Sequence, residues 1–189
     1  MSTNFQSLSV ARQEKNIPML FGVALSKNQL LINRNRKYAS YIFDSVTCFN
    51  EMKTSRLRTS ILDTSYNFTE ANYIMDFARN SSMKVCGSTL WYDQTDNPLT
   101  YLTSLVTNAA SKSTMSNILN NHVTTTINHF QTNYPNQIYS WNVLNQVPAV
   151  QANRILGPNY FLDLYRYAEV AVRGTSIKLF YNDSFKEIG

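Results

Sequence analysis

Short apolar runs alternate with longer amphipathic segments along this chain of 189 residues. The short runs end at polar residues and fit buried strands, whereas the longer segments repeat apolar residues with a helical period. This alternation predicts parallel βα units. The predicted strands are Leu20–Leu25, Ser45–Asn50, Lys84–Leu90, Ile138–Leu144 and Ser176–Tyr181, and the predicted helices are Leu30–Ser40, Thr69–Asn80, Thr114–Thr132 and Tyr160–Arg173.

The segment Thr69–Asn80 carries the clearest helical pattern. Thr69 can cap its first turn through the side-chain oxygen. One face of the helix is lined by Tyr73, Ile74, Phe77 and Ala78. The region Thr103–Thr114, in contrast, is rich in small polar residues and predicts a loop.

Composition limits the size of the hydrophobic core, and the N-terminal segment indicates the cellular compartment. Apolar residues make up 43% of the chain, which is enough for one ordinary hydrophobic core. No run of 18 apolar residues is present, so we expect no membrane span. Met1 to Pro18 is polar and lacks the apolar region of a secretory signal. The sequence alone therefore favours an intracellular chain, or one whose leader has been removed.

The charge pattern and the cysteines exclude further classes of protein. The net charge is +5, but the basic residues are scattered and no nucleic-acid-binding motif accompanies them. We therefore expect a solvated basic face and no nucleic-acid partner. Cys48 and Cys86 both fall in predicted strands. Buried free thiols are favoured over a disulfide.

The stretch Trp141–Gln146 reads W-N-V-L-N-Q and resembles the W-D-V-V-N-E segment of family 10 glycoside hydrolases, the xylanases. Other segments resemble this family in the same order, from about residue 20 to 185. They are Phe21–Ala24, Asn50–Lys53, Asn67–Thr69 with Asp76–Ala78, Gly87–Trp91, Asn121–Val123 and Leu179–Asp183. The shared order is a stronger signal than any single match.

The resemblance implies an α/β fold, an incomplete TIM-type (β/α) barrel with about five parallel strands and outer helices. Residues 1–19 would form a polar N-terminal extension and residues 20–189 the partial barrel domain. Such barrels have eight strands and typically about 250 residues. An open five-stranded sheet leaves two edge strands with unpaired backbone groups. We therefore expect either further chain or a second protomer at the open side, as in a homo-oligomer or array.

The resemblance also implies where catalysis would take place. The family's general acid/base maps to Gln146, and a carboxamide cannot ionise near neutral pH. The family's nucleophile ends a seventh strand, which has no counterpart in this sequence. Ser88 and Asn142 also replace a family His and Asp, and Tyr92 stands where the second His is lost. The catalytic set is degenerate at Gln146, and no catalytic residue is intact.

Part of the family's sugar-binding set is retained. The resemblance assigns substrate contacts to Asn50, Lys53, Asn145 and Trp91. Two other interpretations stay open, because Lys53 could form an ion pair with Glu51, and Asn145 and Gln146 could satisfy backbone groups at the barrel rim. Phe49 replaces the family's Glu before Asn50, which weakens the case for binding.

Metal and cofactor chemistry find no support in the sequence. His122 and His129 lie seven residues apart on one predicted helix, and no third ligand has suitable spacing. We interpret both as packing or hydrogen-bonding residues and expect no metal and no cofactor.

Three functions are compatible with these observations. The first is a catalytically inactive xylanase-like protein that is structural or self-assembling. The second is a carbohydrate-binding pseudoenzyme for β-1,4-linked sugars, with a xylan-type polysaccharide as its partner. The third is a fragment of an endo-1,4-beta-xylanase that hydrolyses xylan.

Overall fold

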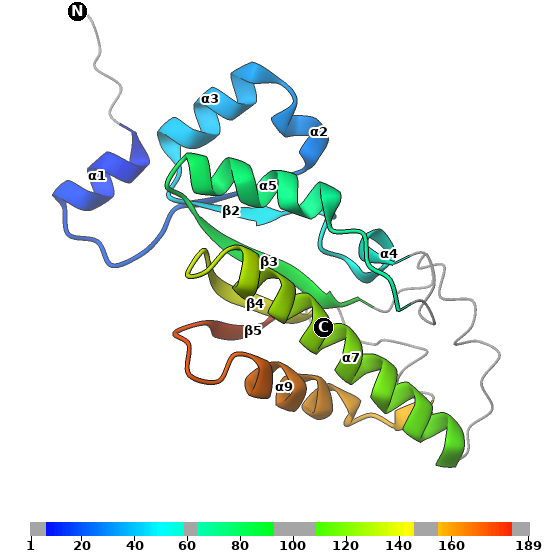
Figure 1. Cartoon of the computed structure of the whole chain (residues 1–189). Helices are drawn as coiled ribbons and strands as arrows, with labels where there is room; N and C mark the ends of the chain where they lie inside the picture. The colour runs from blue at the N-terminus through cyan, green and yellow to red at the C-terminus, as the bar shows by residue number, and fades with distance from the viewer. Residues whose placement is uncertain (1–6, 59–63, 93–108, 146–154, 183–189) are drawn as a thin grey trace, which may run out of the picture.

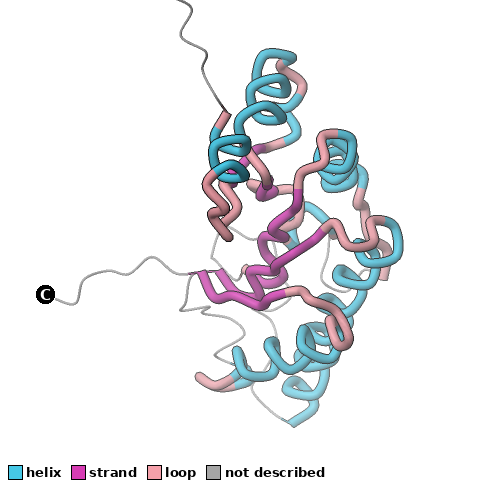
Figure 2. Tube along the Cα trace, turned by 90° about the vertical axis from the view of Figure 1, so that its left-hand side faces the viewer, coloured by secondary structure: helices cyan, strands magenta, loops and turns pink. Residues whose placement is uncertain are grey.

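The computed structural model describes residues 7–58, 64–92, 109–145 and 155–182. In these ranges five parallel strands form one sheet in the order β1-β2-β3-β4-β5. Figure 2 shows the strands gathered on one side and most of the helices on the other. This arrangement confirms the predicted α/β class and the five parallel strands of a partial barrel.

The element bounds agree with the predicted strands to within a few residues. The strands are β1 Gly22–Leu25, β2 Ser45–Cys48, β3 Lys84–Trp91, β4 Ile138–Asn145 and β5 Lys178–Asn182. The helices are α1 Leu8–Glu14, α2 Lys27–Leu30, α3 Asn33–Ile42, α4 Thr54–Leu57, α5 Thr69–Asn80, α7 Ala109–Asn133 and α9 Tyr160–Ala171 (Figure 1).

The predicted helix Leu30–Ser40 is found as α3, but its bounds are Asn33–Ile42, and Leu30 ends a separate short helix, α2. The short helix α2 begins earlier, where Ser26 and Gln29 form a capping box that satisfies the first backbone amides. The chain then turns extended at Ile32, and α3 starts at the next residue. The capping box therefore starts a separate helix, and α3 begins three residues later than predicted, at Asn33 instead of Leu30.

Two details of the helix predictions are also wrong. Helix α5 has the predicted bounds, but Phe68 occupies the N-cap position and Thr69 donates its backbone N–H to the side-chain oxygen of Asn67. Helix α7 begins at Ala109, so the last part of the predicted loop Thr103–Thr114 is helical. Residues 103–108 lie outside the described ranges.

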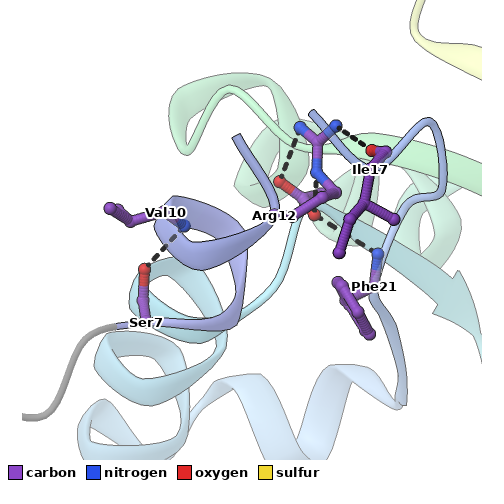
Figure 3. A network of polar contacts seen from close by, with 6 residues as sticks. Ser7, Val10, Arg12, Ile17 and Phe21 are labelled. Atoms are coloured by element: carbon purple, nitrogen blue, oxygen red, sulfur yellow. Dashed lines mark hydrogen bonds and ion pairs between the residues drawn. The ribbon is translucent and has the colours of Figure 1, made fainter. Parts of the chain in front are cut away.

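The N-terminal helix α1 is tied to the start of the sheet by a buried carboxylate. The Arg12 guanidinium donates to both oxygens of Asp44, at 2.9 and 3.3 Å, and the backbone N–H of Phe21 donates to the same carboxylate. Ser7 caps α1 by accepting from the backbone of Val10 (Figure 3). Helix α1 is thus anchored beside the entry to β1 and β2.

The core centres on β3 and β4. Trp91 and Trp141 are fully buried, and the Trp141 ring packs against Phe130 of α7. A Cβ atom on Gly87 would lie 2.2 Å from the Trp141 ring, so only glycine fits there without rearrangement. Cys48 is buried and Cys86 half-buried, and both are free thiols, as predicted.

The last strand, β5, is much more exposed. Phe180 and Tyr181 expose 51% and 47% of their surfaces. Beside them, an apolar groove of about 400 Å³ lies between the end of β4, the end of β5 and helix α9. None of the helices in the described ranges is long and apolar enough to cross a membrane.

Candidate functional site

Polar side chains gather at the carboxyl ends of the strands. Asn50 follows β2, Tyr92 follows β3, Asn145 ends β4 and Asn182 ends β5. In (β/α) barrels this end of the sheet carries the active site. Asn50 and Asn182 therefore lie at this rim, while Gln146 lies outside the described residues.

Asn50, Lys53 and Tyr92 form a compact cluster at this rim. The Lys53 ammonium donates to Oδ1 of Asn50 at 2.7 Å and lies 4.8 Å from the centre of the Tyr92 ring. Partial burial lowers the pKa of Lys53, and the nearby positive charge of Arg56 lowers it further. The ammonium thus contacts one amide oxygen and one aromatic face. A polar group next to an aromatic face is also a combination that can bind a sugar ring.

The alternative interpretation, an ion pair between Lys53 and Glu51, is not found among the ion pairs of the described residues. Glu51 is 6% exposed and its carboxylate accepts two backbone N–H groups, from Lys27 at 2.7 Å and from Asn50 at 3.0 Å. Glu51 therefore fixes the loops after β1 and β2. The side chain of Lys53 contacts Asn50 and Tyr92 instead.

Asn145 is oriented by its neighbour on the next strand. The side-chain amide of Asn182 donates to Oδ1 of Asn145 at 2.6 Å, where the two strand ends lie in register. This contact occupies the oxygen of Asn145 and leaves its Nδ2 group to donate elsewhere. The amide is thus held in place on a partly exposed strand end.

Trp91 lies deeper than the sequence suggested. Its side chain is fully buried and meets the His122 ring edge-on at a centroid distance of 6.1 Å. Trp91 contributes to the core beneath the rim. Its predicted contact with a substrate stays a prediction.

His122 belongs to a buried hydrogen-bonded cluster under the site. Its Nε2 lies 3.2 Å from the Thr54 hydroxyl and its Nδ1 lies 3.3 Å from the Tyr66 hydroxyl. Burial lowers the pKa of His122 to about 3, and the positive charge of Arg58 acts in the same direction. The imidazole is therefore neutral at physiological pH. This agrees with a packing and hydrogen-bonding role.

His129 lies on the same helix and also makes packing and hydrogen-bonding contacts. Its Nε2 lies 2.9 Å from the side-chain oxygen of Asn72, and its ring stacks on Phe68. Burial lowers its pKa. Among the residues that the structure describes, no group of three or more potential metal ligands is present.

Tyr92 is the member of the site that sequence analysis missed. The sequence marked it only as standing where a family His is lost. One signal was available, because Tyr92 lies two residues after the third predicted strand, Lys84–Leu90, and so was expected near its carboxyl end. Its position over Lys53 depends on a neighbouring strand and needed the fold.

Curated relatives agree with this fold. The sequence model of glycosyl hydrolase family 10 matches residues 7–187. Endo-1,4-beta-xylanase A of Thermoanaerobacterium saccharolyticum is 32% identical over 151 residues, which cover 75% of this chain and 13% of that protein. Endo-1,4-beta-xylanase A of Thermotoga maritima is 30% identical and covers 90% of this chain, which spans 17% of its length.

A solved structure shows the same architecture. A mutant of the intracellular xylanase of Thermoanaerobacterium saccharolyticum, solved in complex with xylotriose, aligns with a TM-score of 0.79 and 26% identity. The alignment covers 97% of this chain and 57% of that one, so this chain spans little more than half of the solved xylanase. By its family match over nearly its whole length, by these relatives and by its strand order, the chain belongs to glycosyl hydrolase family 10.

Proposed function

We propose that this chain binds a β-1,4-linked xylo-oligosaccharide and does not hydrolyse it. The observation that carries the proposal is the cluster of Asn50, Lys53 and Tyr92 at the carboxyl ends of β2 and β3. The relatives of this chain named above are xylanases, and a mutant of one of them was solved in complex with xylotriose.

The cluster offers the groups that recognise sugar hydroxyls. An ammonium has three donors, and the contact with Asn50 accounts for one of those of Lys53. A hydrogen bond to a charged group contributes about 1.5–3 kcal/mol. Asn145, whose oxygen is occupied by Asn182, presents its Nδ2 group at the neighbouring strand end. Together these donors line the strand ends along which an oligosaccharide would lie.

The absence of hydrolysis is proposed from the residue at the acid/base position. By resemblance this position is Gln146, whose amide can neither give a proton to the leaving sugar nor take one from water. Retaining glycosidases need two carboxyl groups on either side of the bond that breaks. Removing one such group typically costs several orders of magnitude in rate.

Binding is tested by calorimetric titration of the purified chain with xylotriose. Lys53→Ala and Asn50→Ala should each weaken binding about tenfold, the loss of one charge-assisted hydrogen bond. Lys84→Ala is the matched control, because Lys84 lies at the opposite end of β3, where it donates to the backbone of Asn136. Equal affinities for all four proteins, or no binding at millimolar sugar, would overturn the proposal.

Hydrolysis is tested separately with xylan and aryl xylosides. We expect no release of reducing sugar. Turnover that disappears on mutation of a residue of this chain would contradict the proposed inactivity and favour a fragment of an active xylanase.

Self-assembly is a second candidate function, supported by the apolar groove beside β5. Its lining is formed by Leu144, Pro158, Phe161, Leu162, Tyr165 and Tyr181. In the described ranges β5 has a neighbour on one side only, and an open strand edge is a template for pairing with another chain. The occupant we propose is a second copy of this chain, joined through the edge and the groove.

Light scattering tests the assembly at micromolar concentration. We expect a dimer or larger species, and Tyr181→Glu should dissociate it by placing a charge in the groove. The matched control is Tyr38→Glu, since Tyr38 is an exposed tyrosine on α3. A monodisperse monomer would sink the homo-oligomer and would favour a following βα unit of a family 10 barrel as the occupant.

A further inference from the structure

A pocket of about 400 Å³ lies at the amino ends of β3 and β4 and beside the loop that leads into β5. Its walls come from the end of α7, the turn before β4 and the residues between α9 and β5. This end of the sheet is opposite to the Lys53 cluster. We call it the amino-end pocket, and its volume lies in the range of sites that hold small organic molecules.

Aromatic rings form much of the wall of the amino-end pocket. Phe130 lies in α7, Tyr134 directly after it, and Tyr139 in β4. The Tyr134 hydroxyl is occupied by α5, because it donates to the backbone of Asn72 at 3.3 Å and to Asp76 at 3.2 Å. Burial and the negative charge of Asp76 raise the pKa of Tyr134 to about 12, so its ring is uncharged. The wall therefore offers neutral ring surfaces against which a flat ligand can pack.

Lys84 is the only charged side chain among the described residues that line this pocket. Its ammonium donates to the backbone carbonyl of Asn136 at 2.7 Å, and Asn136 also lines the pocket. An ammonium has three donors, so two remain beyond this contact. Lys84 belongs to none of the ion pairs of the described residues. The pocket therefore attracts a negative charge and disfavours a cation.

The other polar side chains of the wall mostly bind the backbone. Gln131 donates to the carbonyl of Ala171 at 3.3 Å, which ties α7 to the end of α9. The Thr175 hydroxyl donates to the carbonyl of Val172 at 2.7 Å and accepts from the N–H of Ile177 at 3.2 Å. These contacts hold the pocket in shape without a ligand. They also leave few groups for the many hydroxyls of a sugar.

We propose that the amino-end pocket binds a small organic anion that carries an aromatic ring. The anionic group pairs with Lys84, and the ring packs on Tyr134 and Tyr139. This inference does not depend on the sugar binding proposed above, since the active site of (β/α) barrels lies at the carboxyl ends of the strands. The two ligands would occupy opposite ends of the same sheet.

Calorimetric titration with phenylacetate tests the proposal, and phenylacetamide is the matched neutral ligand. The acid should bind about fivefold more tightly than the amide, the upper range for an ion pair open to solvent. Lys84→Gln should remove this difference, while the affinity for the amide stays the same. The control variant is Lys37→Gln, which removes an exposed lysine on α3 and should bind both ligands like the wild type.

A second variant tests the location of the ligand. Ser176 is exposed and lines the pocket, so Ser176→Phe should fill the space and abolish binding of both ligands. No binding of phenylacetate at millimolar concentration, equal affinities for acid and amide, or unchanged binding by Ser176→Phe would each overturn the proposal. Equal losses in Lys84→Gln and Lys37→Gln would overturn it too, because they would indicate a diffuse attraction of charges.

Titration of the same variants with xylotriose separates this inference from the proposed function. Lys84→Gln and Ser176→Phe should bind the sugar like the wild type, since both positions lie away from the strand ends that carry Asn50 and Lys53. Sugar binding without phenylacetate binding would refute the amino-end pocket alone. Phenylacetate binding without sugar binding would refute only the proposed function.

Discussion

The middle of the sheet and its β5 margin contain similar aromatic residues in opposite surroundings. In β3 and β4, Trp91 and Trp141 are fully buried under α7. In β5, Phe180 and Tyr181 are about half exposed, and α9 adds the exposed Leu162. Aromatic content therefore does not tell which part of a sheet is closed. The exposure of an aromatic side chain depends instead on how many sides of its strand are covered by neighbouring elements.

The two margins of the sheet also differ from one another. Near the start of β1, helix α1 is fixed by the contact of Arg12 with Asp44, whose side chain is only 7% exposed. At β5 the apolar groove is open to solvent in the described part of the chain. An anchored helix thus lies near one margin of the sheet, whereas an open apolar groove lies at the other.

The largest effect should come from the middle of the sheet. Trp141→Ala should lower the free energy of unfolding by about 3–5 kcal/mol, since it leaves a large cavity next to Phe130. Phe180→Ala on β5 should change it by less than about 0.5 kcal/mol. Urea unfolding measures both. Losses of similar size would show that β5 is covered in solution.

The next effect concerns the margin beside which α1 is anchored. Asp44→Asn should cost about 1–3 kcal/mol, because the buried carboxylate holds both Arg12 and the backbone of Phe21. The matched control is Asp163→Asn, which removes a solvent-exposed ion pair with Arg166 and should cost less than about 1 kcal/mol. The same urea series reports both, and equal costs would refute the structural role of Asp44.

The pH dependence of the free energy of unfolding should report the buried imidazole of His122. The pKa of His122 is about 3 in the folded chain and about 6.5 when unfolded, so the unfolded state binds the proton first as pH falls. Stability should therefore fall from pH 6.5 towards pH 3 by up to about 1.4 kcal/mol per pH unit. His122→Gln should flatten this slope. Identical slopes in thermal unfolding at several pH values would contradict it.

The smallest effect on stability should come from the rim. Because the pKa of Lys53 is lowered, its ammonium is lost below the usual value of about 10.4, and sugar binding should weaken as pH rises through that range. The folded state gives up this proton before the unfolded state, so the Lys53 contribution to stability rises over the same range. Lys53→Arg stays charged and should keep binding at alkaline pH. Matching profiles for both proteins would argue against Lys53 as a donor.

The sequence was sufficient for the strands but not for every helix. Val85 and Val143 belong to apolar runs that end at polar residues, and burial in a parallel sheet requires such runs. The start of α2 depends on the capping box of Ser26 and Gln29, and the break before α3 depends on one extended residue, Ile32. Local backbone choices of this kind leave little trace in the apolar pattern.

The site was predictable in its residues more than in its contacts. Resemblance pointed to Asn50 and Lys53, and the structure brings them together at 2.7 Å. The part played by Glu51 could not be predicted, because one partner is the backbone N–H of Lys27, at the start of α2, which follows another strand. Contacts between strand ends depend on register, which one sequence does not reveal.

The burial of both tryptophans gives the chain a built-in optical probe. The sequence contains two tryptophans, and neither exposes any of its surface. The intrinsic tryptophan fluorescence should therefore have its emission maximum at the short wavelengths typical of an apolar environment. This maximum should shift to the red only when β3 and β4 separate. Events at Phe49 or along β5 would leave the emission wavelength unchanged, so this signal reports the integrity of the central strand pair alone.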